Sequence, residues 1–134
     1  DAVGLSPTPC SRRVKRLEES GLVERHVTLL DQAMLGLKLT AWINITMDRH
    51  TPDRFEAFEE EVRGYPEVME CAVVTGQAAD YLVKAVVPDM AYYERFLLGR
   101  LTRIPGVTGV QSSFELRRVI HRTELPLDHI ELGE

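Results

Sequence analysis

Four basic side chains crowd into five consecutive positions near the start of the chain, where they could bind an anion such as phosphate. They are Arg12, Arg13, Lys15 and Arg16, in a protein of 134 residues whose net charge is −5. A basic cluster on an otherwise acidic chain is typical of a compact anion-binding element. The competing interpretation is a helix face that simply points into solvent, and charge alone favours that second interpretation.

Residue types that usually carry catalysis or bind metals are scattered along the chain. Its four histidines share no ligand spacing: His26, His50, His121 and His129. Motifs of the kinds CxxC, HExxH, GxGxxG, P-loop and GxSxG are missing. We therefore expect no enzymatic activity, no metal and no cofactor. The two cysteines, Cys10 and Cys71, are too few for a disulfide framework, and we interpret both as core residues.

Composition indicates an ordinary globular protein, with 44% hydrophobic and 28% charged residues. No apolar run approaches the ~18 residues that span a bilayer. We also find no basic-then-apolar leader. The sequence therefore predicts a soluble, cytoplasmic protein without a membrane partner.

The basic cluster lies on a predicted helix that covers about residues 7–20. Ser6 suits the cap position before this helix, Pro7 suits its first position, and Gly21 suits its end. One face of the helix is apolar and consists of Cys10, Val14 and Leu17. The helix thus combines an apolar side that needs a partner with a basic side that faces outward.

This arrangement resembles the helix that DNA-binding proteins place in the major groove. Side chains near the N-terminal half of such helices approach base edges, and those further along contact phosphates. The base-facing candidates are Thr8, Ser11 and Arg12; the phosphate-facing candidates are Arg13, Lys15 and Arg16. The stretch that follows, residues 22–30, is β-prone and is predicted to form a wing strand.

The remainder of the chain predicts four strands and two helices in the order βαββαβ. The strands are expected at residues 37–47, 68–75, 81–87 and 107–120, and the helices after Thr51 or Asp53 and after Asp89. A shift of 39 residues superposes the two halves, so that Pro66 matches Pro105 and Val68 matches Val107. Two βαβ units make an α+β, ferredoxin-like fold. Right-handed crossovers place both helices on one face of its sheet.

The other face of that sheet is expected to carry Trp42 together with polar residues. A sheet covered on one side often uses its free face or edges for a partner. We therefore predict a two-fold dimer, in which a second chain covers Trp42, Asn44 and Thr46. The last segment, residues 125–132, is predicted either to pack across a partner or to form a surface tail.

Four segments together resemble the Lrp/AsnC family, the leucine-responsive or feast/famine transcriptional regulators. The run VGLSPTPCSRRVKRLEESGLV at residues 3–23 is similar to the recognition-helix signature of that family. Three later segments also match: PEVMEC at 66–71, VTG at 74–76 followed by DYL at 80–82, and IPGV at 104–107. The stretch 98–126 is similar to regulators of branched-chain amino-acid catabolism.

The resemblance implies a winged helix-turn-helix followed by a βαββαβ domain that binds small effectors, usually amino acids. It assigns residues 1–31 to the C-terminal part of the DNA-binding domain with a linker, and residues 32–134 to the effector-binding and oligomerisation domain. Its expected partners are double-stranded DNA, for the full-length parent, and copies of the chain itself, as dimers that assemble into an octamer.

A free amino acid needs a fixed charge, several N–H donors and an apolar wall. The turn at residues 75–80 supplies these features together, through Thr75, Gly76, Gln77, Ala78, Ala79 and Asp80. The small residues allow close backbone approach to a carboxylate, and Asp80 could pair with the ammonium group. The family places this turn at a junction between dimers, near the strand with Gln111, Ser112 and Ser113; Tyr81 completes the predicted effector set. The competing interpretation is a plain hairpin turn in which Asp80 bonds its own backbone.

Two departures from the family pattern limit what is carried over. Helices that would precede the recognition helix are not in this sequence, so we expect a fragment that binds DNA poorly by itself. The turn at 76–81 is one residue longer than usual, so the identity of the ligand is not carried over. The leading interpretation is an amino-acid-responsive transcriptional regulator of amino-acid metabolism; the alternative is a stand-alone sensing module without DNA binding.

Overall fold

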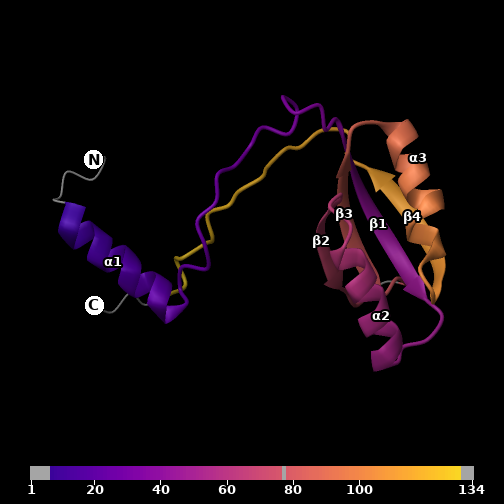
Figure 1. The fold of residues 1–134 in the computed structure, drawn as a ribbon, viewed down its shortest axis with the longest axis horizontal. Helices are drawn as coiled ribbons and strands as arrows, with labels where there is room; N and C mark the ends of the chain where they lie inside the picture. The colour runs from indigo at the N-terminus through magenta and orange to yellow at the C-terminus, as the bar shows by residue number, and fades with distance from the viewer. Residues whose placement is uncertain (1–6, 77, 131–134) are drawn as a thin grey trace. The chain divides into compact units, whose positions relative to one another are not determined.

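The chain divides into two compact units, residues 1–31 and residues 32–134. The computed structural model describes residues 7–76 and 78–130. Its helices and strands, in chain order, are α1 (Pro7–Ser20), β1 (Leu39–Met47), α2 (Pro52–Arg63), β2 (Val68–Val73), β3 (Tyr81–Val87), α3 (Met90–Gly99), the 3-10 turn η1 (Leu101–Arg103) and β4 (Val107–Phe114) (Figure 1). Two residues named above, Ser6 and Gln77, lie outside the described ranges.

The first unit consists of α1 and an extended segment. The predicted helix is confirmed at Pro7–Ser20, and it ends at Gly21, whose φ of 86° suits glycine. Ser20 closes the last turn because its hydroxyl donates a hydrogen bond to the Leu17 carbonyl at 2.8 Å. Val14 and Leu17 remain 40% and 41% exposed. The apolar face of α1 is thus left uncovered by the part of the chain that the structure describes.

The wing strand predicted at residues 22–30 is wrong for the described structure. Residues 24–31 belong to neither a helix nor a strand. A strand needs a hydrogen-bonded neighbour to be stable, and no described residue pairs with this stretch. High β-propensity alone therefore did not produce a strand here.

The second unit is a four-stranded antiparallel sheet in the order β2-β3-β1-β4. Helices α2 and α3 lie on one face of this sheet (Figure 1). This order and layering confirm the ferredoxin-like prediction. Period-two alternation is confirmed along β1, whose inward residues are at most 3% exposed: Ala41, Ile43, Ile45 and Met47.

Local signals explain where the two covering helices begin and end. Pro52 starts α2, directly after Thr51, and Gly64 follows its last residue. Asp89 caps α3 as predicted, since its carboxylate accepts a hydrogen bond from the Tyr92 N–H at 2.8 Å. Helix α3 stops at Gly99, and the η1 turn follows it at Leu101–Arg103.

Three strands are shorter than predicted, and the first of them, β1, begins at Leu39 instead of Leu37. Strand β2 ends at Val73 instead of Thr75, and β4 ends at Phe114 instead of Ile120. The physical reason for β4 is the length of its neighbour, because β1 begins at Leu39 and Phe114 already lies opposite Ala41. Residues after Glu115 therefore have no described strand to pair with.

The core lies between the sheet and the two helices. Phe58 stacks on Tyr81 with ring centroids 4.5 Å apart, and Tyr65 meets Phe96 edge-on at 5.7 Å. Cys71, interpreted above as a core residue, is exposed. Its side chain does alternate toward the helices, but β2 is an edge strand and nothing flanks it on the outer side. Among the described residues, no helix is long and apolar enough to cross a membrane.

Candidate functional site

The turn between β2 and β3 is fixed to the end of β1 by Asp80. The Asp80 N–H donates to the Ile45 carbonyl at 2.8 Å. One carboxylate oxygen, Oδ2, accepts a hydrogen bond from the Met47 N–H at 2.7 Å, and the other, Oδ1, lies 2.8 Å from His50 Nε2. The Asp80 side chain is only 16% exposed, whereas His50 is 68% exposed. Asp80 is therefore bonded on both oxygens within the chain.

A pocket of about 240 Å³ opens beside this turn, on the face of the sheet away from the helices. It is formed by β1, β4 and the turn, and its lining residues are Asn44, Thr46, Ala78, Ala79, Gly109, Val110 and Gln111. Cross-strand pairing explains the convergence, since Asn44 lies opposite Gln111 and Thr46 opposite Gly109. Two amides and a hydroxyl offer donors and acceptors, while the glycine and alanines leave room for a ligand.

The structure brings together only part of the predicted effector set. Ala78, Ala79 and Gln111 line the pocket. Ser113 lies opposite Trp42, and so on the same face, but outside the pocket lining. Thr75 and Gly76 are exposed in the turn, where Gly76 has a φ of 87°.

Two predicted effector residues lie on the opposite side of the sheet. Ser112 pairs with the buried Ile43, and its hydroxyl contacts the Tyr93 hydroxyl beneath α3. Tyr81 is 1% exposed and donates a hydrogen bond to Glu59 of α2 at 2.6 Å. Burial, followed by this bond to Glu59, raises the pKa of Tyr81. Both side chains therefore contribute to the packing of the helices.

Sequence reasoning did not assign Asn44, Thr46, Gly109 and Val110 to the effector site. The first two had been placed on the free face of the sheet, so a signal was present in the alternation of β1. What was missing is the register between β1 and β4, because that pairing decides which polar residues end beside the turn.

The remainder of the free face is partly covered within the second unit. Gln32 Nε2 donates hydrogen bonds to the Leu37 carbonyl at 2.9 Å and to Thr40 Oγ1 at 3.0 Å. The Lys84 ammonium lies 5.3 Å from the centre of the Trp42 ring and 3.7 Å from Glu70. Thr40 and Lys84 are consequently only 3% and 7% exposed. The central part of the face, around Trp42 and Asn44, stays half-buried.

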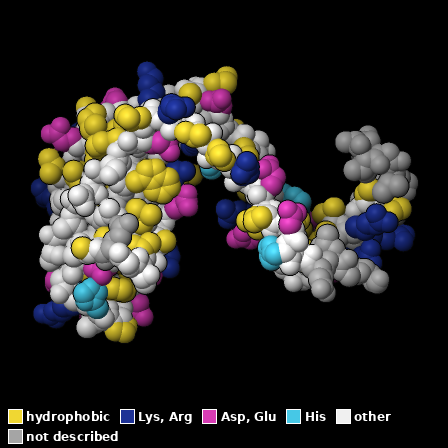
Figure 2. Space-filling view, turned by 180° about the vertical axis from the view of Figure 1, so that it is seen from behind, with side chains coloured by type: hydrophobic (Ala, Val, Ile, Leu, Met, Phe, Trp, Pro, Cys, Tyr) yellow, Lys and Arg dark blue, Asp and Glu magenta, His cyan; other side chains and the backbone are white. Residues whose placement is uncertain are grey.

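The basic cluster on α1 is fully available to a partner. Ser11 and the four basic residues from Arg12 to Arg16 are exposed. In Figure 2 the Lys and Arg side chains of this helix gather in one dark blue cluster. Thr8 lies within the first turn of α1. An exposed basic helix of this kind can meet a polyanion along its length.

Within residues 7–76 and 78–130 there is no group of three or more His, Cys, Asp or Glu side chains that could hold a metal ion. The two histidines with described carboxylate partners, His26 with Glu18 and His50 with Asp80, belong to separate pairs. The chemistry that this structure offers is thus hydrogen bonding to a small molecule and charge pairing with a polyanion.

Two protein-family models match the chain, one in each unit. Residues 40–125 match the model of the Lrp/AsnC ligand binding domain, and residues 1–24 match a winged helix-turn-helix DNA-binding model. The chain is 41% identical over 125 residues to the Bkd operon transcriptional regulator of Pseudomonas aeruginosa, covering 93% of this chain and 81% of that protein. It is 41% identical over 117 residues to the leucine-responsive regulatory protein of Escherichia coli, covering 87% and 71%.

A solved structure is similar in fold as well as in sequence. It is a transcriptional regulator of Neisseria meningitidis in complex with L-methionine, with a TM-score of 0.86 and 42% identity. The match covers 95% of this chain and 81% of that one. The similarity therefore extends over both described units and is not confined to the sheet domain.

Proposed function

The chain belongs to the Lrp/AsnC family of transcriptional regulators, and we propose that it is a DNA-binding regulator that responds to an amino acid. The 240 Å³ pocket at the turn carries the effector part of this proposal. Drug-sized ligands occupy pockets of about 300–1,000 Å³, so this pocket suits a smaller molecule. The relative solved with L-methionine supports an amino acid as that molecule.

The pocket can hold an amino acid through neutral polar groups. The Asn44 and Gln111 amides can each donate or accept a hydrogen bond, and the Thr46 hydroxyl, which donates to the Ala78 carbonyl at 3.4 Å, can still accept one. The backbone at Ala78 and Ala79 is open to a carboxylate, because alanine side chains do not screen it. We assign to Asp80 the role of holding this turn in place, since its oxygens already accept hydrogen bonds from Met47 and His50. A bound ammonium would share Asp80 with the donors from Met47 and His50 that already contact its two oxygens.

Thermal denaturation of residues 1–134 with each of the twenty amino acids tests the effector part. A ligand that binds only the folded chain adds about 2.7 kcal/mol of stability at a hundredfold excess over its Kd. We expect at least one amino acid to raise the melting temperature, and Asn44→Ala to abolish that rise. Ser113→Ala is the matched control, because Ser113 lies on the same strand face outside the pocket. A melting temperature that no amino acid changes would contradict the proposal.

Helix α1 is proposed as the recognition helix of the DNA-binding domain. Its exposed bases and the match of residues 1–24 to a winged helix-turn-helix support this role over a stand-alone sensing module. Thr8, Ser11 and Arg12 are assigned to base edges. Arg13, Lys15 and Arg16 are assigned to phosphates, and Ser6 to the helix cap.

Salt-dependent DNA binding tests this assignment, in the natural protein with any residues that precede Asp1. Removing one phosphate contact lowers the slope of log K against log salt by about 0.9, equally for all DNA sequences. We expect that behaviour for Lys15→Gln. Arg12→Ala should instead relax discrimination at one base pair, by about 1–3 kcal/mol. An unchanged salt slope in Lys15→Gln would refute the phosphate assignment.

We also propose that the free sheet face is covered by a second copy, as a two-fold dimer. Trp42 lies at the centre of that face, between its cross-strand partners Lys84 and Ser113. The family resemblance further suggests that four such dimers form an octamer. Light scattering that shows a monomer at micromolar concentration would contradict both assemblies.

The remaining assignments follow from the family. We propose that residues 1–31 belong to the DNA-binding domain with its linker, that residues 32–134 form the effector and assembly domain, and that the protein acts in the cytoplasm. The relatives named above are transcriptional regulators. We propose accordingly that this chain has no enzymatic activity and no cofactor besides its effector.

A further inference from the structure

A stretch of the second unit that follows β4 is basic, although that unit as a whole is acidic. Residues 32–134 carry eleven bases and sixteen acids, a net charge of −5, whereas residues 116–123 carry three bases and no acid. The three bases are Arg117, Arg118 and Arg122. All eight residues are exposed, they belong to neither a helix nor a strand, and Figure 1 draws them as an extended trace. Positive charge is thus concentrated on one accessible segment.

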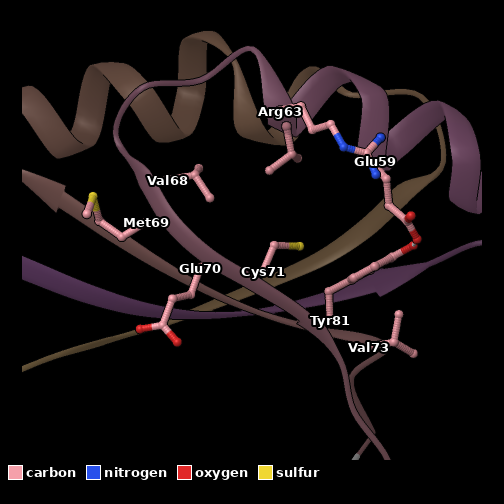
Figure 3. Close-up of a pocket in the computed structure, with 9 residues that line it drawn as sticks. Glu59, Arg63, Val68, Met69, Glu70, Cys71, Val73 and Tyr81 are labelled. Carbon is pink, nitrogen blue, oxygen red and sulfur yellow. Dashed lines mark hydrogen bonds between the residues drawn. The ribbon is translucent and has the colours of Figure 1, made fainter. Parts of the chain in front are cut away.

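The charges around the groove between α2 and β2 are, by contrast, paired within the chain (Figure 3). Glu59 accepts a hydrogen bond from the Tyr81 hydroxyl at 2.6 Å, and the Arg63 guanidinium lies 3.5 Å from Glu60. The Cys71 thiol projects into this groove, where desolvation raises its pKa to about 11. Glu59 and Arg63 therefore already have partners of their own.

Two arginines of the segment 116–123 lack such partners. Arg117 and Arg122 form no ion pair with any residue in the ranges 7–76 and 78–130. Arg118 is held to the second unit, because its Nη2 donates a hydrogen bond to the Gln32 amide oxygen at 3.2 Å and the Gln32 amide donates to Thr40 Oγ1 at 3.0 Å. Arg118 thus fixes the segment in place, while Arg117 and Arg122 on either side of it present unpaired guanidinium groups.

The spacing of an extended chain matches that of phosphates along DNA. Extended residues advance about 3.3 Å each, and each strand of DNA carries one phosphate per about 3.4 Å of helix axis. Arg117 and Arg122 are five residues apart, so the distance between them is at most about 17 Å, which lets them reach different phosphates of one duplex. Guanidinium groups bind phosphate through paired hydrogen bonds, which makes arginine well suited to this contact.

We propose that residues 116–123 are a second DNA-binding segment, in which Arg117 and Arg122 bind phosphates beyond those that the recognition helix contacts. This inference rests on the proposed DNA-binding function, and it adds contacts outside residues 1–24, which match the winged helix-turn-helix. Contacts to phosphates carry no direct sequence information. The segment therefore raises the affinity for every DNA sequence alike, and Arg118 positions it through Gln32.

A negatively charged lipid surface is the other polyanion that a basic segment can meet. Val119 and Ile120, between the arginines, are 74% and 66% exposed and would suit the apolar part of such a surface. Segments that lie on membranes in this way are typically amphipathic helices, whereas residues 116–123 form no helix. The observations consequently favour DNA as the partner.

Salt-dependent DNA binding tests the proposal, in the natural protein with any residues that precede Asp1. The test variant is Arg117→Gln/Arg122→Gln, and the matched control is Arg49→Gln/Arg63→Gln, which removes the same charge from two exposed arginines elsewhere in the unit. Each lost phosphate contact lowers the slope of log K against log salt by about 0.9, so the test variant should lose about 1.8. With equal affinities at 1 M salt, that loss corresponds to about sixtyfold weaker binding at 0.1 M.

The loss should be equal for two duplexes of the same length and different sequence, and the control should keep the parent slope within about 0.3. Lys15→Gln, measured alongside, separates this inference from the proposed function. A slope that Lys15→Gln lowers and the test variant leaves unchanged would overturn the second segment alone. A parent chain that binds no DNA would contradict the proposed function together with this inference.

Two further measurements exclude other occupants of the segment. Light scattering should give the same mass for the parent and for Arg117→Gln/Arg122→Gln; a smaller mass in the variant would overturn the proposal, because the arginines would then hold copies of the chain together. Vesicles of equal parts phosphatidylserine and phosphatidylcholine should sediment no more parent than variant. Sedimentation of the parent alone, with an unchanged slope for DNA, would assign the segment to a lipid surface instead.

Discussion

Replacing Asp80 by alanine should weaken the second unit, because its carboxylate holds the β2–β3 turn to β1. A hydrogen bond to a charged group contributes about 1.5–3 kcal/mol, and the Met47 N–H that Asp80 accepts from belongs to a residue only 3% exposed. The contact with His50 adds less, about 0.2–1 kcal/mol, because His50 is 68% exposed. We therefore expect Asp80→Ala to lower the free energy of unfolding by about 2–3 kcal/mol.

Urea denaturation followed by circular dichroism measures this change. At about 4 °C per kcal/mol, the melting temperature should fall by about 10 °C. His50→Ala should lower the free energy of unfolding by less than about 1 kcal/mol. The loss in Asp80→Asn should lie between those of His50→Ala and Asp80→Ala, because the amide oxygen of asparagine still accepts a hydrogen bond from the Met47 N–H. A loss below about 0.5 kcal/mol in Asp80→Ala would refute the assignment of Asp80 as the anchor of the turn.

The same variants separate two roles for Asp80 toward a ligand. If Asp80 only positions the turn, Asp80→Asn should retain amino-acid affinity within about threefold. If it pairs with the ammonium group, the loss of its charge should cost about tenfold or more, since a charged hydrogen bond exceeds about 1.4 kcal/mol. Calorimetry with the amino acid that shifts the melting temperature distinguishes the two outcomes, provided light scattering shows the assembly unchanged.

Three further changes test other parts of the structure. Gly106→Ala should lower the free energy of unfolding in urea by about 1–3 kcal/mol, because the φ of Gly106 is 95° and a Cβ there would lie 2.8 Å from Arg54 Cδ. Gly99→Ala is the control and should leave the free energy of unfolding unchanged, because a Cβ at Gly99 has no neighbour within 4 Å. Arg100→Ala should lower the free energy of unfolding by about 2 kcal/mol, because it removes the ion-pair partner of Glu67, whose side chain is only 8% exposed. Breaking a fully buried ion pair costs about 3–5 kcal/mol, and the smaller value is expected here because Arg100 is 38% exposed. Burial opposes ionisation of Glu67, yet hydrogen bonds from Arg100 and Tyr92 hold its pKa below the ordinary value. The stability that ionised Glu67 contributes is therefore complete above about pH 4.3 and is lost as pH falls through the folded-state pKa. The free energy of unfolding of Arg100→Ala should consequently fall less on acidification than that of the parent chain. The rate of Cys71 alkylation should rise about tenfold per pH unit up to a pKa of about 11, and a plateau near pH 9 would contradict the desolvated thiol.

Much of the fold could be predicted because its signals are local. Thr51 and Asp89 stand where the two covering helices begin, as their types predict, and alternation along β1 separates its buried residues from Trp42 and Asn44. The 39-residue repeat then gives the βαββαβ plan. These features depend on neighbours in sequence, so a single chain is enough to reveal them.

The errors concern properties that depend on neighbours in space. β4 cannot extend to Ile120 because β1 begins at Leu39, only two residues beyond the partner of Phe114, and residues 22–30 form no strand because no described residue pairs with them. Cys71 alternates like a core residue but lies on an edge strand. The ferredoxin-like plan itself puts the second strand at an edge, so that signal was available.

The sequence predicts the turn of the candidate site, but it does not predict the pocket that the turn forms with β1 and β4. Ala78, Ala79 and Gln111 were identified because small residues and a nearby polar strand are visible in the sequence. Asn44 and Thr46 join them only through the β1–β4 register. Ser112 and Tyr81 were misplaced relative to the pocket because a one-residue step along a strand reverses the face.

Titration calorimetry of pocket variants tests the central claim most directly. The amino acid that raises the melting temperature of residues 1–134 is titrated into the parent chain, Gln111→Ala and Ser113→Ala. If the pocket beside the turn is the effector site, Gln111→Ala should weaken binding by about fivefold to tenfold, from the loss of one hydrogen bond of about 1 kcal/mol, while Ser113→Ala stays within twofold. Equal affinities in all three chains, or no binding of any amino acid to the parent, would contradict the account.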